Sequence, residues 1–279
     1  MNRIGFVSII VAVTWPGLLF AEEAPTPAET SWQALTENVR RLYDAGEYVE
    51  AAKAAEEAVD VSRTAFGEEH TRTSTALNNL AEVCGAQGRF KEAESLHLRA
   101  LMINEKLLGE FHPAVATDAF NLGALYLQEK KYALAEPMLR RALVTLQIHD
   151  GPRDVSEVPV LGLLGDAVAG QHREKDAEQL YRQALAIVAD VEGEEHPVAA
   201  ELFSSLAAVA EAQGHIDDAE LHLRQAITIA TRTLGPDHEM TEAFVHDLAT
   251  FYEAHGMPAR AEPLREREAL LREARERSP

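Results

Sequence analysis

The chain has only one cysteine, Cys84, so no disulfide can form within it and a disulfide-stapled fold is excluded. Basic residues are also scarce: 26 Lys and Arg stand against 46 Asp and Glu, which gives a formal net charge of −20. Because phosphate neutralisation needs a basic surface, we expect no nucleic-acid partner. Aromatic residues make up only 6% of the chain. Alanine, leucine and glutamate dominate instead, and these three residues favour helix.

Long apolar runs are missing apart from one at the N-terminus, Ile4 to Phe20, so a bundle of membrane-spanning helices is excluded. This run follows Arg3, is broken by Pro16-Gly17 and precedes Ala21, which is the layout of a secretory signal peptide. We therefore predict a signal peptide over residues 1–21 and an exported protein, periplasmic in a bacterium or secreted. The alternative is an uncleaved N-terminal membrane anchor, which would provide the chain's only contact with a membrane.

The remainder is predicted to be a short linker, residues 22–30, followed by a single repeat domain, residues 31–279. Three residue types recur with a period of 42 residues. These are Gly67, Gly109, Gly151, Gly193 and Gly235; Leu80, Leu122, Leu164, Leu206 and Leu248; and Ala51, Ala93, Ala135, Ala177, Ala219 and Ala261. Six such units account for nearly all the residues after Ala21, so no room is left for a separate catalytic domain.

Each unit has the pattern of two helices joined by a short turn. In the third unit an apolar stripe at helical spacing is formed by Val115, Ala119, Leu122, Leu125 and Tyr126. This stripe predicts a first helix that begins after Pro113. A turn at Lys130-Lys131 and a second helix from about Tyr132 to Ile148 follow. The short turn makes the two helices antiparallel neighbours.

Three short patterns in this unit carry a family resemblance: Asn121-Leu122-Gly123-x-x-Tyr126, Tyr132-x-x-Ala135 and Leu139-x-x-Ala142. They resemble the tetratricopeptide repeat, a helix–turn–helix unit of about 34 residues. The longer period and the Gly-x-x-His-Pro loop are similar to the kinesin-light-chain type of this repeat. The resemblance extends from about Trp32 to the C-terminus. It implies an all-α fold, a right-handed superhelical solenoid of six antiparallel helix pairs whose last pair includes a C-terminal capping helix.

The same resemblance implies a non-enzymatic scaffold that binds a protein or peptide partner in the concave groove lined by the first helix of each pair. By register, the predicted groove residues are Arg40, Tyr43, Asn78, Asn79, Glu82, Phe120, Asn121, Leu127, Asp166, Glu201, Glu211, His246 and Glu253. This set has one arginine and no lysine, which argues against recognition of an acidic tail. We predict a partner that is neutral or apolar toward the asparagines and basic toward Glu201, Glu211 and Glu253. The alternative is that the asparagines bridge adjacent helices.

The fourth unit departs from the pattern. Its predicted first helix, Val155 to Gln171, contains Pro159, Gly162, Gly165 and Gly170. Glycine weakens a helix interior by about 1 kcal/mol relative to alanine. This irregularity indicates drift in a tolerant repeat, or else a hinge or a point where a ligand approaches the backbone closely.

Histidines recur in the loops between units, at His70, His112, His196 and His238. They lie one repeat apart, too far for shared metal ligation at about 2 Å, so we expect no metal site and no cofactor. Their predicted role is at the start of the following helix. No nucleophile elbow or phosphate-binding loop is present, so no catalytic residue is predicted. Two alternatives to the scaffold stay open: an accessory or regulatory subunit that docks a membrane or envelope complex through its outer surface, and an enzyme with a site in the groove.

Overall fold

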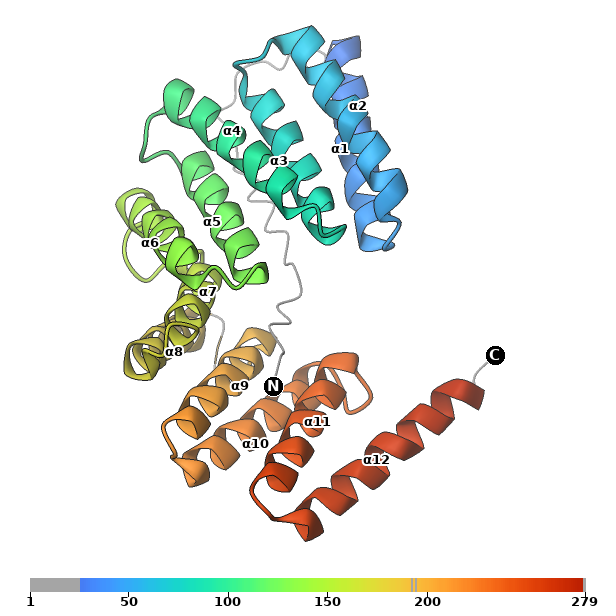
Figure 1. The fold of residues 1–279 in the computed structure, drawn as a ribbon, viewed down its shortest axis with the longest axis vertical. Coiled ribbons are helices and arrows are strands. Elements are labelled where there is room, and N and C mark those ends of the chain that lie inside the picture. Colours follow the sequence, from blue (N-terminus) through green and yellow to red (C-terminus); the bar gives the residue numbers. More distant parts are fainter. Residues whose placement is uncertain (1–25, 192, 194, 278–279) are drawn as a thin grey trace. The chain divides into compact units, whose positions relative to one another are not determined.

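The computed structural model describes residues 26–191, 193 and 195–277, with side chains up to residue 271. The predicted signal peptide lies outside the described residues. Every regular element in the described part is an α-helix (Figure 1). The helices are α1 Pro27–Asp44, α2 Tyr48–Phe66, α3 Thr71–Ala86, α4 Phe90–Leu108, α5 Pro113–Gln128, α6 Tyr132–His149, α7 Glu157–Ala169, α8 Glu174–Val191, α9 Pro197–Ala212, α10 Ile216–Thr233, α11 Glu239–Ala254 and α12 Pro258–Arg277. Along the chain they follow one another as six successions of helix, turn and helix, as the 42-residue period predicts. None of the helices described combines the length and apolarity needed to cross a membrane.

The first helix begins inside the segment that we predicted to be a linker. Thr26 caps α1: its hydroxyl accepts a hydrogen bond from the Glu29 amide at 3.3 Å, and the Glu29 carboxylate accepts one from the Thr26 amide at 2.8 Å. This reciprocal capping box fixes the start of a helix, and Pro27 suits the first helical position because its missing N–H has no partner there. Residues 27–30 are therefore the first turn of α1, and the predicted linker boundary is wrong.

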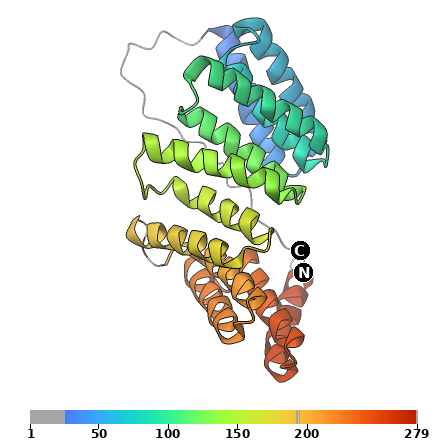
Figure 2. The ribbon, with the colours of Figure 1, turned by 60° about the vertical axis from the view of Figure 1, so that its left-hand side comes forward.

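The chain divides into two compact units, residues 1–131 with α1 to α5 and residues 132–279 with α6 to α12. Within each unit every helix packs against the next one in the sequence (Figures 1 and 2). First helices of successive pairs also touch one another, as α1 with α3, α3 with α5 and α7 with α9. Second helices make no comparable mutual contact in the part of the chain described. We call the exposed side of the first helices α1, α3, α5, α7, α9 and α11 the first-helix face.

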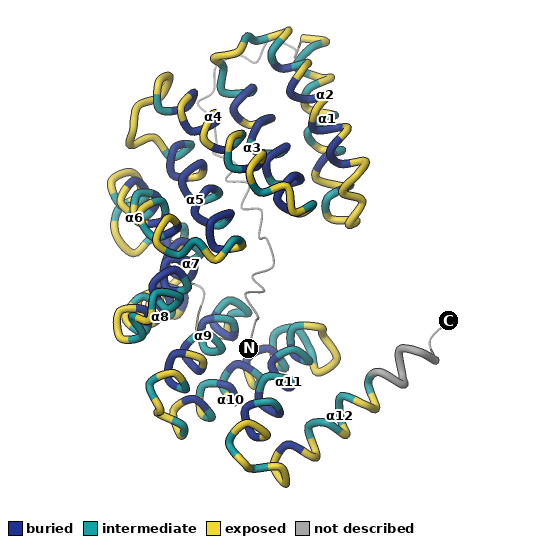
Figure 3. Tube along the Cα trace, viewed as in Figure 1, coloured by how far each residue is buried: buried dark blue, intermediate teal, exposed yellow. Residues whose placement is uncertain are grey.

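Small buried residues allow the helices to approach closely. The recurring alanines Ala93, Ala135 and Ala177 are fully buried, which fits helix axes about 8–10 Å apart. Buried positions follow the sides of the helices that face their neighbours (Figure 3). The predicted stripe of α5 is buried, Leu122 included, and Cys84 is a buried free thiol that packs in the core.

At four junctions a glutamate ties the second helix of one pair, α4, α6, α8 or α10, to the pair that follows it. These glutamates are 42 residues apart, and we call them the junction glutamates. Glu94 accepts from Tyr126 Oη at 2.8 Å, Glu136 from Gln171 Nε2 at 2.8 Å, Glu178 from Gln213 Nε2 at 3.1 Å and Glu220 from Tyr252 Oη at 3.0 Å. The donors lie near the end of the following first helix. A hydrogen bond of this kind adds about 0.5–1.5 kcal/mol of stability.

The loop histidines have the predicted role. Nδ1 of His70, His112, His196 and His238 accepts a hydrogen bond from the backbone amide two residues later, which caps α3, α5, α9 and α11. The preceding glycines, such as Gly67 and Gly109, have φ of 98° and 88°, so they end the previous helix in a conformation that favours glycine. The fourth unit has no such histidine. Its loop is held by the buried Glu157, which accepts from Gln147 Nε2 at 2.8 Å and from the Asp154 amide at 3.3 Å.

The glycines of the fourth unit make room for tyrosines of this chain. Helix α7 has 13 residues and is shorter at both ends than predicted. A Cβ atom at Gly165 would lie 2.7 Å from Tyr181 Cζ, and one at Gly170 would lie 2.6 Å from Tyr132 Cγ. A Cβ atom at either position would overlap the tyrosine ring, so only glycine fits without a shift of the ring. At these two glycines it is therefore the aromatic rings of α8 and α6, and not a ligand, that approach the backbone closely.

Candidate functional site

The predicted groove residues are distributed over both units. In the first unit Arg40 and Tyr43 lie on α1, Asn78, Asn79 and Glu82 on α3, and Phe120, Asn121 and Leu127 on α5; in the second unit Asp166 lies on α7, Glu201 and Glu211 on α9, and His246 and Glu253 on α11. All of them except Leu127 keep part of their surface exposed. Arg40 and Glu253 are the most open.

Leu127 was wrongly predicted to line the groove, because its exposed fraction is only 2%. Its register equivalents Glu211 and Glu253 remain in contact with water. The position lies in the last turn of the helix, at the edge of the packed interface. An apolar side chain there turns inward, since its burial gains about 1.5–3 kcal/mol, whereas a carboxylate stays outside.

The Asn78 side chain bridges three helices. We left this role open for the asparagines as the alternative to ligand binding. Its Nδ2 donates to Asp118 Oδ1 on α5 at 2.5 Å, and its Oδ1 accepts from His97 Nδ1 on α4 at 2.8 Å. Asn104 on α4 donates to the other Asp118 oxygen at 2.7 Å. Burial lowers the pKa of His97 to about 4, so the ring is neutral and its single N–H lies on Nδ1, facing an oxygen that can only accept. This half-buried asparagine therefore has a structural role in linking α3, α4 and α5.

Asn79 and Asn121 differ from Asn78. Both are half-buried on the first-helix face, at the same register of successive repeats. Neither side chain makes a hydrogen bond to another residue that the structure describes. Each amide therefore retains both a donor and an acceptor for a ligand.

Three carboxyl groups on the first-helix face have no cation beside them. Glu82 and Glu201 form no hydrogen bond or ion pair with any described residue. Asp166 Oδ1 accepts from Tyr181 Oη at 2.6 Å, but Asp166 Oδ2 is buried with no hydrogen-bond partner within the described residues. The pKa of each of the three carboxyls is raised to about 7, chiefly by desolvation; for Asp166 the hydrogen bond from Tyr181 opposes the rise and the charge of Glu201 adds to it. Ionising each of these carboxyls therefore costs free energy unless a cation binds beside it.

Two further acidic residues of the predicted groove, Glu253 and Glu211, lie close to basic side chains of the second unit. A hydrogen bond from Arg265 lowers the pKa of Glu253, whose Oε2 lies 2.8 Å from Arg265 Nη2. Glu211 Oε1 lies 3.7 Å from His255 Nε2. The arginine comes from α12 and the histidine from the end of α11, so register on the first helices could not have predicted either pair.

The junction glutamates differ from Glu82, Asp166 and Glu201 because basic side chains lie beside them. Burial by itself would raise the pKa of Glu136, but hydrogen bonds from Arg173 and Gln171 hold it below the usual range. Glu220 has a lowered pKa for the same kind of reason, with Arg260 and Tyr252 as its partners. Carboxylates that hold repeats together are thus neutralised within the chain, while Glu82, Asp166 and Glu201 are not. In the described part of the chain, no three His, Cys, Asp or Glu side chains are grouped so as to hold a metal ion.

Comparisons with known proteins agree with this architecture. The family model of the tetratricopeptide repeat matches residues 41–106, 73–144 and 157–232. No curated protein matches the sequence. A solved structure of a putative kinesin light chain from Podosopora anserina, with nearly identical TPR-like repeats, is 23% identical with a TM-score of 0.65, covering 76% of this chain and 99% of that one.

Two further solved structures cover more of the sequence. BtubC (BKLC) from P. vanneervenii is 19% identical with a TM-score of 0.65, covering 91% of this chain and 94% of its own. The apo form of RapI is 17% identical with a TM-score of 0.65, covering 90% of this chain and 86% of its own. Identities this low show a shared fold. They leave the ligand to be argued from the residues of this chain.

Proposed function

Because the chain belongs to the tetratricopeptide repeat family, whose fold is typical of protein–protein interaction, we propose that it is a non-enzymatic scaffold that binds a basic segment of a partner protein. The observation that carries this proposal is the set of uncompensated carboxyls on the first-helix face, Glu82, Asp166 and Glu201. A lysine or arginine of the partner would supply the missing cation at each of them.

The energetics favour such a ligand. A hydrogen bond to a charged group is worth about 1.5–3 kcal/mol, roughly twice a neutral one, and the low local polarity that raises these pKa values also strengthens the pairing. The net charge of −20 attracts a basic partner from a distance and repels an acidic one. In the first unit, Asn79 and Asn121 would pair with the backbone of a neutral stretch of the same ligand.

The test compares labelled peptides of equal length that are basic, neutral or acidic, titrated into the full chain at low salt. We expect the basic peptide to bind most tightly, and Asp166→Asn and Glu201→Gln each to weaken it by about 5- to 10-fold. Asp218→Asn removes an exposed carboxylate from the second helix α10 and is the matched control, expected to leave affinity unchanged. Preference for the acidic peptide, or equal loss in the control, would refute the proposal.

A second candidate, docking through the outer surface, has one observation in its favour. Leu98 and Met102 lie one turn apart on α4, with exposed fractions of 39% and 67%. At the equivalent positions of the preceding repeat, α2 carries the charged residues Glu56 and Asp60. An apolar spot on a second helix suits contact with another protein. Met102→Lys would abolish capture of a partner in this mode and leave binding of the basic peptide intact.

We also propose that the protein is exported, with residues 1–21 as a cleaved signal peptide. The support is the charged start, the apolar run and the small residue at Ala21. Cell fractionation with N-terminal sequencing tests this proposal. A mature chain that starts at Glu22 is expected, whereas an intact start in the membrane fraction would indicate the anchor.

A further inference from the structure

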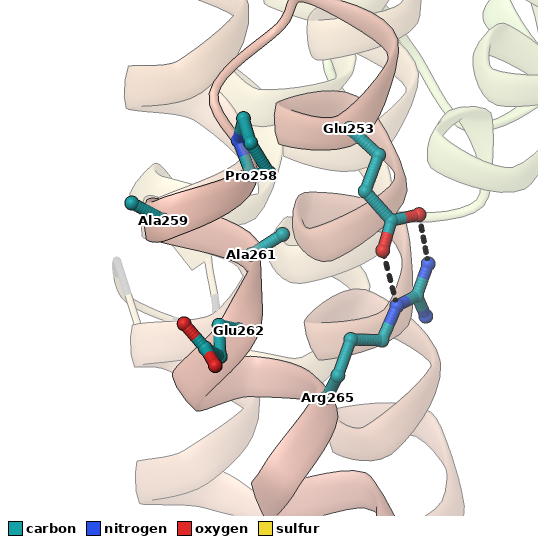
Figure 4. Close-up of a pocket in the computed structure, with 6 residues that line it drawn as sticks. All are labelled: Glu253, Pro258, Ala259, Ala261, Glu262 and Arg265. Atoms are coloured by element: carbon teal, nitrogen blue, oxygen red, sulfur yellow. Dashed lines mark hydrogen bonds and ion pairs between the residues drawn. The ribbon is translucent and has the colours of Figure 1, made fainter.

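A cavity of about 470 Å³ opens between the end of α11 and the first turns of α12 (Figure 4). Its lining residues are Glu253, Pro258, Ala259, Ala261, Glu262 and Arg265. This volume lies within the range of about 300–1,000 Å³ that is usual for ligand pockets. Glu262 is the fifth member of the junction-glutamate register, and it is exposed. It forms no hydrogen bond or ion pair with any residue that the structure describes.

One repeat earlier, the equivalent positions enclose a tyrosine. Glu220, the counterpart of Glu262, accepts a hydrogen bond from Tyr252 Oη at 3.0 Å. Ala219 and Leu223, the counterparts of Ala261 and Arg265, belong to the same packed cluster as the Tyr252 ring, as does Ile216, the counterpart of Pro258. The cavity therefore lies at the register positions that enclose Tyr252 one repeat earlier, and we call it the open socket.

The first unit contains a filled socket of the same kind. Tyr126 Oη donates to Glu94 at 2.8 Å, and Lys131 Nζ lies 5.7 Å from the centre of the Tyr126 ring. In the second unit Arg260 Cζ lies 4.5 Å from the centre of the Tyr252 ring. Both filled sockets thus combine a glutamate for the hydroxyl with a cation at the ring face, and the Tyr252 socket also has a small and apolar wall for the ring.

In the open socket an acceptor and a wall occupy the same register positions as before, and a cation lines the socket at a different position. Glu262 is the acceptor, and the buried Ala261 is the wall. The cation is Arg265, which stands where Leu223 stands one repeat earlier and is held by Glu253 at 2.8 Å and Glu268 at 3.0 Å. Figure 4 shows the Glu253–Arg265 pair beside Ala261, with Glu262 joined to none of the residues drawn. These ion pairs hold the guanidinium at the wall of the socket.

We propose that this socket binds a tyrosine presented by a helix of a partner protein, with the hydroxyl donating to Glu262 and the ring lying on Ala261 beside Arg265. The site lies on α11 and α12 and does not depend on the proposed role of the first-helix face.

A second copy of this chain that stacked its α1 after α12 as a following repeat would not fill the open socket. At the register of Tyr252 and His255 its α1 carries Leu42 and Ala45, which offer no hydroxyl or imidazole. At the register of Lys131 it carries Glu47, which would face Glu262 with like charge. Phosphorylation of the partner tyrosine would also prevent binding, because Glu253 and Glu262 are both acidic.

The probe is a fluorescent peptide that copies residues 239–260, with its α11 part, residues 239–254, held helical by a side-chain crosslink on the face opposite Tyr252. Two matched peptides carry phenylalanine or phosphotyrosine at that position. Anisotropy titration against the full chain should show the tyrosine peptide binding about 5- to 10-fold more tightly than the phenylalanine peptide, and the phosphotyrosine peptide more weakly than both.

Glu262→Ala in the full chain should abolish the preference for tyrosine over phenylalanine. Glu266→Ala, which removes an exposed glutamate one turn later on α12, should preserve the preference. Thermal melts of both variants show whether the fold is intact. Equal affinity for the tyrosine and phenylalanine peptides, absence of binding by all three, or a dimer of the chain that Glu262→Ala dissociates would overturn the proposal.

Discussion

The Tyr181 hydroxyl donates a 2.6 Å hydrogen bond to Asp166 Oδ1, and the tyrosine ring reaches this carboxyl because Gly165 leaves it room. The ring crosses from α8 to the first-helix face of its own repeat. His97 and Arg265, at the same register of other repeats, cross in the same way to Asn78 and to Thr250. A polar residue at this position of a second helix therefore influences the charge and hydrogen bonding of the first-helix face of the same repeat.

Gly165→Ala should destabilise the protein by about 1–3 kcal/mol, since the new methyl group would overlap the Tyr181 ring and force it away from Asp166. The matched control is Gly85→Ala, where the nearest side-chain atom, Leu125 Cδ1, would lie at an ordinary 3.4 Å. Denaturant unfolding of both variants provides the measurement. A Gly165→Ala chain at least as stable as the parent would contradict the packing role of this glycine.

The pH dependence of stability should contain a contribution from Asp166. Its pKa is raised to about 7 in the folded protein, against about 3.9 in an unfolded chain, so the folded state holds the proton more tightly. The resulting stabilisation is fully present below about pH 4 and is lost as the pH rises through 7. The free energy of unfolding of the parent, relative to Asp166→Asn, should therefore fall between pH 5 and pH 8. A flat difference would contradict the raised pKa.

His97 should act in the opposite direction. Burial lowers its pKa to about 4, below the value of about 6.5 for an unfolded chain, so its contribution is present above pH 6.5 and is lost as the pH falls toward 4. Nuclear magnetic resonance titration of the His97 ring should show no protonation at pH 6. A midpoint near 6.5 would mean that the ring is not enclosed with Asn78 as described.

Asn78 and Asn79 are adjacent in sequence but should respond differently to substitution. Asn78→Ala leaves Asp118 and His97 each without one partner and should cost about 1–3 kcal/mol. Asn79→Ala removes no hydrogen bond to a described residue and should stay within about 0.5 kcal/mol of the parent. Thermal melts separate the two, and similar losses would show that Asn79 also has a structural role.

The junction glutamates offer another matched pair. Glu220→Ala removes the acceptor of Tyr252 and the partner of Arg260, and should cost about 1–2 kcal/mol. Glu262→Ala, at the same register of the next repeat, should change the free energy of unfolding by less than about 0.5 kcal/mol. If both substitutions destabilised the chain equally, Glu262 would have a partner within the folded protein.

Local signals made much of the fold predictable. The 42-residue period and the apolar stripes predicted the helix pairs closely, as for the helix expected from Tyr132 to Ile148 and observed from Tyr132 to His149. The capping role of the loop histidines also followed from their position after a glycine. These features depend on residues only a few positions apart, so they can be recognised in the sequence.

The candidate site was predicted only in part, because its properties depend on residues distant in sequence. Asn78 and Asp118 are 40 positions apart, and Glu253 meets Arg265 across the turn between α11 and α12. The missed start of α1 is a different case, since Thr26 and Glu29 form a local capping box that could have been recognised.

The amino-acid sequence by itself determined the repeat unit, its two helices and the side of each helix that is buried, because helical periodicity and caps depend on neighbouring residues. Tertiary structure alone decided which carboxylates are neutralised by the chain and which are left for a ligand. That outcome depends on how closely the helices of adjacent pairs approach and on the small residues, Gly165 above all, that allow a side chain to pass between them.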